Sequence, residues 1–175
     1  MSRLLAAYLA LCRWLDRVAL ALCVAAGLFL TAAVLAIVVL RYGFGTGFIE
    51  LQDAAAYGFA VLMVFSLPVA LTRNGHVRVE VVSERLPPRY LRVADALALV
   101  AFLVPVFGLL IHAWWPQLSY AWSIREGSVE TGGLGGLYLV KTALPVAAAL
   151  MIAQGLALVI GPRQPAHHGG SETAL

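Results

Sequence analysis

Four long apolar segments, separated by short polar stretches, make up most of this chain. They cover residues 18–40, 54–72, 94–115 and 137–160. A bilayer core of about 30 Å is crossed by about 20 residues of α-helix, and each segment has roughly that length. The pattern therefore predicts an all-α integral membrane protein, with a single four-helix transmembrane domain over residues 1–161.

Composition supports the same conclusion. Of the 175 residues, 62% are hydrophobic and 12% are charged, and the mean hydropathy of +0.89 lies outside the range of soluble globular proteins. The net charge of +3 raises the question of nucleic-acid binding. The basic residues, however, fall in the gaps between apolar segments rather than on one polar domain, so no nucleic-acid partner is expected.

The placement of basic residues orients the helices. If the N-terminus is cytoplasmic, only three basic residues lie outside: Arg41, Arg125 and Lys141. The other nine lie inside: Arg3, Arg13, Arg17, Arg73, Arg78, Arg85, Arg89, Arg92 and Arg163. Cytoplasmic loops carry the excess of lysine and arginine, so we expect both termini to be cytoplasmic.

The two ends of the chain differ from the spans. Residues 2–16 alternate apolar residues with Arg3, Arg13 and Asp16, which fits an amphipathic interfacial helix before the first span. A simple helical extension of that span is an equal alternative. The apolar run 18–40 is longer than a signal-peptide core, so we expect a retained helix. The polar, proline- and glycine-containing tail 162–175 is expected to be disordered.

Ionisable groups are almost absent from the predicted spans. Burying one at mid-depth costs at least about 2.5–3.5 kcal/mol, so such groups normally mark a functional path. Glu50 and Asp53 stand at the start of the second span, His112 near the far end of the third, and Lys141 in the first turn of the fourth, where a lysine can snorkel outward. We expect neither a self-sufficient transport path nor enzyme activity.

No cofactor is expected either. A membrane-embedded haem needs two histidines inside spans, and His112 has no intramembrane partner. Cys12 and Cys23 are eleven residues apart on one helical stretch, about 16 Å of rise, which excludes a disulfide between them, and no metal-ligand spacing surrounds them. A haem-bearing anchor of a redox enzyme and a small stand-alone exporter remain the alternatives to a non-catalytic subunit.

The polar run Arg73-Asn74-Gly75-His76-Val77-Arg78-Val79-Glu80 separates the second and third spans. Gly75 allows a turn with positive φ, and the arginines suit lipid phosphates or a partner's carboxylates, with glutamate available for pairing. Solvated charge that only sets topology would explain the arginines but not Gly75-His76. We therefore expect a docking or anchoring role for Arg73, Gly75, His76, Arg78 and Glu80.

This run also resembles the Gly-His-(Ile/Val)-Arg-Val-(Asp/Glu) signature of the DctQ-type small membrane subunit of TRAP transporters. Further similarity covers about residues 41–155, in the family's order, and is closest to the mannitol/chloroaromatic-type branch. The matching segments are Arg41-Tyr42-Gly43-Phe44, Leu51-Gln52-Asp53, Trp122…Glu126…Ser128…Gly132-Gly133-Leu134, Lys141…Pro145 and Gln154-Gly155. The chain departs from the family at Glu50-Leu51-Gln52-Asp53, where Trp-x-Glu-Glu is more usual.

The resemblance implies a small permease subunit of a tripartite, binding-protein-dependent, sodium-coupled secondary transporter in a bacterial inner membrane. Its implied partners are a large multi-span subunit, which holds the substrate and sodium sites and moves as an elevator, and a periplasmic binding protein. The small subunit would be a static scaffold for the uptake of small organic acids or related solutes. Candidate contact residues on the outer side are Arg41, Glu50, Asp53 and Lys141.

Overall fold

The computed structural model describes residues 3–73, 93 and 96–161 of the chain. Four helices in this part are long and apolar enough to cross a membrane, and no strand occurs among the described residues. They are α1 (Arg3–Gly43), α2 (Ile49–Thr72), a helix over Ala96–Ser123 and α6 (Leu137–Ile160). The third comprises a π-helical turn, η1 (Leu99–Leu103), followed by α5 (Val104–Ser123). The prediction of an all-α protein with four membrane-spanning helices is confirmed.

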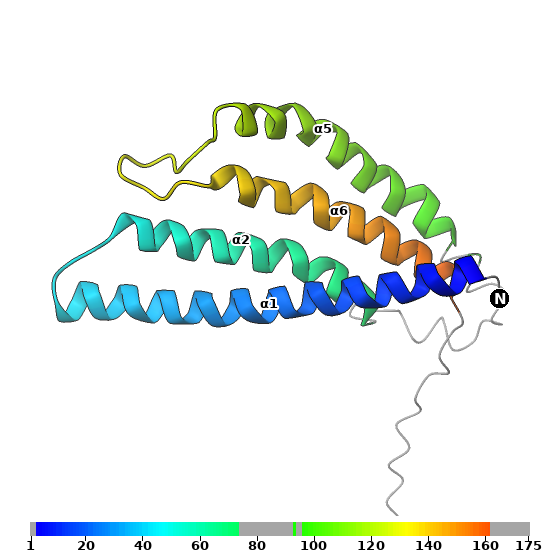
Figure 1. Cartoon of the computed structure of the whole chain (residues 1–175), viewed down its shortest axis with the longest axis horizontal. Coiled ribbons are helices and arrows are strands. Elements are labelled where there is room, and N and C mark those ends of the chain that lie inside the picture. Colours follow the sequence, from blue (N-terminus) through cyan, green and yellow to red (C-terminus); the bar gives the residue numbers. More distant parts are fainter. Residues whose placement is uncertain (1–2, 74–92, 94–95, 162–175) are drawn as a thin grey trace, which may run out of the picture.

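The helices form an open row (Figure 1). α1 packs against α2, α2 against α6, and α6 against α5, so that α1 and α5 lie at opposite edges. α1 also contacts α6 through its N-terminal half, where Ala19 and Ala147 share a buried cluster with Phe65 and Val69 of α2. We call the end with the connectors 44–48 and 124–136 the loop end, and the end where α1 begins and α6 stops the terminal end.

α1 is one continuous helix of 41 residues, about 60 Å long, or twice the thickness of a bilayer core. Of the two alternatives for residues 3–16, the structure therefore shows the helical extension, and a separate interfacial helix is absent from the described residues. The physical reason is local, because no glycine or proline precedes Gly27. Tyr8 also packs on α6, where its hydroxyl donates to the carbonyl of Ala153 at 2.6 Å.

Two further helices extend beyond the predicted spans. α2 begins at Ile49, five residues before the expected start, and α5 continues to Ser123, eight residues past the expected end. The aromatic stretch after Trp114 continues as helix through Pro116. The sequence had suggested that His112 lies near the end of the third span. In the structure, it lies well inside the apolar helix Ala96–Ser123.

Candidate functional site

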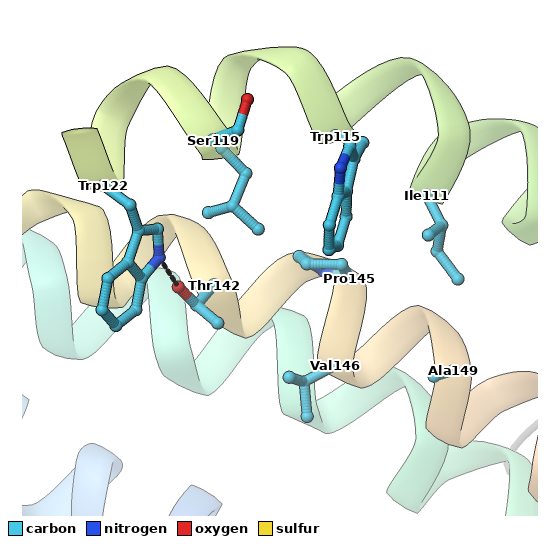
Figure 2. Close-up of a pocket in the computed structure, with 9 residues that line it drawn as sticks. Ile111, Trp115, Ser119, Trp122, Thr142, Pro145, Val146 and Ala149 are labelled. Carbon is cyan, nitrogen blue, oxygen red and sulfur yellow. Dashed lines mark hydrogen bonds between the residues drawn. The ribbon is translucent and has the colours of Figure 1, made fainter.

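α5 and α6 are joined near the loop end by a tryptophan. The indole N–H of Trp122 donates to the hydroxyl of Thr142 at 3.0 Å (Figure 2), and that hydroxyl in turn donates to the carbonyl of Tyr138 at 2.8 Å. The rings of Trp122 and Tyr138 meet edge-on with centroids 4.9 Å apart, a favoured aromatic geometry. These contacts fix the separation of α5 and α6 near the loop end.

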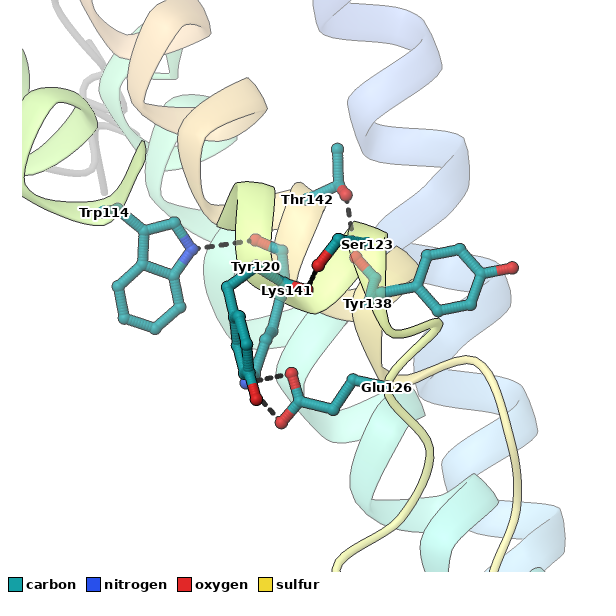
Figure 3. Close-up of polar contacts among 7 residues, drawn as sticks. All are labelled: Trp114, Tyr120, Ser123, Glu126, Tyr138, Lys141 and Thr142. Atoms are coloured by element: carbon teal, nitrogen blue, oxygen red, sulfur yellow. Dashed lines mark hydrogen bonds and ion pairs between the residues drawn. The ribbon is translucent and has the colours of Figure 1, made fainter. Parts of the chain in front are cut away.

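A second tryptophan compensates for a proline inside α6. Pro145 has no N–H, so the carbonyl of Lys141, four residues earlier, loses its helical hydrogen bond. The indole N–H of Trp114 on α5 donates to this carbonyl at 3.2 Å (Figure 3). A freed backbone carbonyl at membrane depth needs such a partner, so this contact both stabilises the proline and attaches α5 to α6.

The side chain of Lys141 forms the strongest polar contact of the site. Its ammonium lies 2.7 and 2.6 Å from the two carboxylate oxygens of Glu126 (Figure 3), and the two side chains are only 18% and 25% exposed. A charge-assisted pair in this partly buried setting is stronger than a surface ion pair. It connects the start of the 124–136 connector to the first turn of α6.

The connector begins with a Schellman-type end to α5. The N–H of Arg125 donates to the carbonyl of Trp122 at 3.3 Å, and the N–H of Glu126 donates to the carbonyl of Ala121 at 2.9 Å. Arg125 occupies the left-handed position of this motif with φ 50°, where glycine is usual. A side chain in that conformation costs roughly 1 kcal/mol, yet the turn places Glu126 opposite Lys141.

The far part of the connector is bound to α2 through Leu134. Asp53 accepts a hydrogen bond from the N–H of Leu134 at 2.8 Å, and the hydroxyl of Tyr57 donates to the carbonyl of Leu134 at 2.9 Å. Asp53 and Tyr57 are four residues apart, on one face of α2. The N–H of Ser128 also donates to that carbonyl, at 3.0 Å. The connector is therefore attached to both α2 and α6.

Gly133 is required by this attachment. A Cβ atom at Gly133 would collide with the carboxylate of Asp53 and with the side chain of Ser128. A Cβ atom at the neighbouring Gly135 would meet nothing within 4 Å. The absence of a side chain at Gly133 therefore lets the Leu134 backbone approach α2 closely.

The terminal end holds a smaller set of polar contacts. Thr72, in the last turn of α2, donates to a carboxylate oxygen of Asp16 on α1 at 2.5 Å, and Arg73 lies 4.0 Å from the other oxygen. Gln154 on α6 is the one buried polar side chain of the described chain, at 1% exposure, and its amide atoms have no hydrogen-bond partner there. Polar groups thus enter the helix interfaces at this end.

Comparison with known families identifies the chain. A family model described as "Tripartite ATP-independent periplasmic transporters, DctQ component" matches residues 30–164, more than three quarters of the sequence. The chain belongs to the DctQ family. A search of curated proteins finds no match. This DctQ chain is therefore the small membrane subunit of a TRAP transporter, as the resemblance had predicted, and its family is a transporter component.

The family works in tripartite systems with a large membrane subunit and a periplasmic binding protein. Family membership and four apolar helices fit a multi-pass protein of the inner membrane. Membership in this family favours a transporter subunit over the two alternatives, the haem-bearing anchor and the stand-alone exporter. The predicted assignment to the mannitol/chloroaromatic-type branch stays a prediction.

The outer-side candidates of this DctQ chain fall into two pairs. Asp53 and Lys141 are both engaged within the chain, Asp53 by the N–H of Leu134 and Lys141 by the carboxylate of Glu126. Arg41 and Glu50 are exposed at the loop end and have no hydrogen bond or ion pair from their side chains among the described residues. Only this second pair is available for outside contacts without breaking an internal one.

On the inner side, Arg73 is the only candidate within the described residues. Gly75, His76, Arg78 and Glu80 lie outside them, so the anchoring role of this run stays a prediction.

The sequence reasoning missed several residues of the site: Asp16, Tyr57, Trp114, Trp122 and Thr142. A local signal existed for one of them, Tyr57. The spacing of Asp53 and Tyr57 places both on one helix face. Pro145 marks the carbonyl of Lys141 as lacking its helical donor, but nothing local indicates that Trp114 supplies one.

We predict that Lys141→Met destabilises the chain by about 1–3 kcal/mol, because it leaves the carboxylate of Glu126 partly buried without its partner. Thermal unfolding of the purified chain in detergent measures this. The double variant Lys141→Met/Glu126→Gln is the control, since it removes the unpaired charge and should recover part of the loss. An unchanged melting temperature for the single variant would contradict the structural role of the pair.

We also predict that Gly133→Ala loosens the connector, because its new methyl group displaces Asp53 or Ser128. Limited proteolysis should cut the 124–136 segment several-fold faster than in the parent chain. Gly135→Ala is the matched control, with open space around the added methyl group, and should be cut at the parental rate. Equal rates in the two variants would show that the close approach at Gly133 has no role.

Proposed function

We propose that this DctQ chain is a static scaffold for the large membrane subunit in sodium-coupled uptake of small organic acids or related solutes. Its helices form a row rather than an enclosed bundle. Its strongest charged pair, Lys141 with Glu126, is satisfied within the chain. These features suit a wall against which another subunit shifts better than they suit a transport path of its own.

The proposed orientation follows from the charge distribution. With both termini cytoplasmic, the positive-inside rule is obeyed, and the loop end faces the periplasm. The 124–136 connector then lies on the side of the binding protein. Its attachment to α2 and α6 supports a preformed docking platform there, with Arg41 and Glu50 among the free charged groups. The inner-side anchor, from Arg73 to Glu80, would hold the cytoplasmic side.

The observation that carries the scaffold proposal is a hollow on the edge helix α5 that contains the imidazole of His112. Gly108, His112 and Pro116 recur every four residues and line a hollow of about 350 Å³ together with Ile111 and Trp115. His112 is exposed well inside an apolar helix, where contact with lipid is costly for an ionisable group.

A helix of the large subunit would remove that cost. Gly108 leaves open space beside α5, and small residues let transmembrane helices approach closely. His112 would then meet a hydrogen-bonding partner from the other chain instead of acyl chains. We therefore propose this edge of the row as the contact surface for the large subunit.

We predict that Gly108→Leu and His112→Leu each reduce co-purification with the co-expressed large subunit by at least about fivefold. The first fills the hollow and the second removes the polar contact. His112→Asn should retain much of the association, because it keeps hydrogen-bonding groups. Ala25→Leu, at an exposed position of α1 on the other edge, is the matched control. Normal assembly in both leucine variants would refute this surface.

Transport itself tests the coupling. In proteoliposomes, we expect uptake of an organic acid only when both membrane subunits, the binding protein and an inward sodium gradient are present. The small subunit alone should transport nothing, since its described helices contain no enclosed polar path. Uptake that persists without the sodium gradient would contradict sodium coupling, and uptake by this chain alone would contradict the scaffold role.

A further inference from the structure

A groove runs between α5 and α6 on the loop-end half of the row (Figure 2). It has a volume of about 520 Å³. One face of α5 supplies residues at helical spacing from Ile111 to Trp122, and α6 supplies residues from Thr142 to Ala149. It is distinct from the edge hollow that contains His112, although Ile111 and Trp115 border both.

The groove offers its occupant almost only apolar surface. The indole N–H of Trp122 and the hydroxyl of Thr142 are used between the two helices, and the hydroxyl of Ser119 donates to the carbonyl of Pro116 at 2.8 Å. Of the polar lining groups, only the indole N–H of Trp115 is without a partner in the described chain. An occupant of this groove is therefore apolar along most of its length.

The length of the groove indicates what kind of apolar occupant fits. From Ile111 to Trp122 there are eleven residues, about 16 Å of helix, which is about half of the bilayer core of roughly 30 Å. The groove is therefore about as long as one leaflet of the bilayer core is thick. A transmembrane helix of a partner would cross the whole core, whereas one acyl chain of a lipid occupies one leaflet.

An exposed arginine follows the loop-end limit of the groove in the sequence. Arg125 comes three positions after the lining residue Trp122, and its side chain has no hydrogen bond or ion pair among the described residues. The adjacent carboxylate of Glu126 is engaged by Lys141, and the exposed Glu130 of the connector forms no ion pair with Arg125.

The backbone of Arg125 adds an independent argument. Its φ of 50° lies in the left-handed region, at the position of the Schellman motif where glycine is favoured. The helix dipole accounts for a basic residue near the end of α5, but not for a side chain at that particular position. Strained residues of this kind are concentrated at functional sites.

We propose that the groove and Arg125 together bind one phospholipid, with an acyl chain along α5 and α6 and the phosphate at the guanidinium. The planar guanidinium suits a phosphate group, and the groove suits a single chain within one leaflet. This site is a property of the isolated chain and does not depend on assembly with the large subunit.

Native mass spectrometry of the purified chain tests the site, with palmitoyl-oleoyl phosphatidylglycerol titrated into lipid-free detergent. We expect one tight adduct, whose affinity falls at least about fivefold in Ala149→Phe, which fills the groove, and in Arg125→Gly, which removes the cation. Arg125→Gly should melt at the same or a higher temperature, because glycine suits its backbone. If Arg125→Gly lowers the lipid affinity while the melting temperature is maintained, the loss reflects binding and not misfolding.

Two controls match these variants. Ala113→Phe adds the same ring to an exposed position of α5 outside the groove, and Arg41→Gly removes another exposed cation at the loop end. Both should bind the lipid as the parent chain does. If Arg41→Gly weakens binding as much as Arg125→Gly, the attraction is unspecific charge and the site is refuted.

A second measurement covers the case in which Ala149→Phe fails to fold. Phosphatidylglycerol brominated on its acyl chain should quench the tryptophan fluorescence of the parent chain in vesicles, and much less so in Trp115→Phe/Trp122→Phe. Equal fractional quenching in the two chains would overturn the proposal. So would unchanged lipid affinity in a folded Ala149→Phe chain that no longer co-purifies with the large subunit, because the groove would then be a protein interface.

Discussion

A backbone group that loses its helical partner inside a bilayer finds no water to replace it. This constraint acts on Lys141, whose carbonyl lacks a helical donor because of Pro145 and accepts a hydrogen bond from the indole N–H of Trp114 on α5. The ammonium of the same residue binds Glu126 at the start of the connector. Lys141 therefore connects α6 to α5 through its main-chain carbonyl and to the 124–136 connector through its side chain. The geometry of the loop end depends on this double role.

The internal satisfaction of polar groups leaves this DctQ chain with two kinds of surface. At the loop end, the acceptors and donors of Asp53, Tyr57 and Glu126 are consumed in holding the connector. On the edge of the row, His112 is exposed on α5, inside the apolar helix Ala96–Ser123. The connector is therefore held by contacts within the chain, whereas the edge helix keeps an exposed surface that the proposed contact with the large subunit would cover.

The sequence was sufficient for features that depend on local patterns. Apolar length located the four helices, and the order of the spans grouped Asp53 and Lys141 as candidates at the same end. It was insufficient where distant residues meet. The contact from Asp53 to Leu134 spans 81 residues, and the one from Trp114 to Lys141 spans 27, so neither leaves a spacing to detect. The place of His112 within its helix differs from the expectation because the helix continues through the aromatic residues beyond Trp115 to Ser123.

The length of α1 has a consequence for how the protein sits in the bilayer. Even a helix tilted by 40° uses only about 26 residues to cross a core of roughly 30 Å, so about 15 of the 41 residues of α1 stand outside the hydrocarbon. Thr72 ends α2 where it bonds to Asp16. This contact aligns the last turn of α2 with the first third of α1. The turns of α1 before Asp16 extend past the end of α2 and are held against α6, where the hydroxyl of Tyr8 donates to the carbonyl of Ala153, so this extension is braced by a second helix.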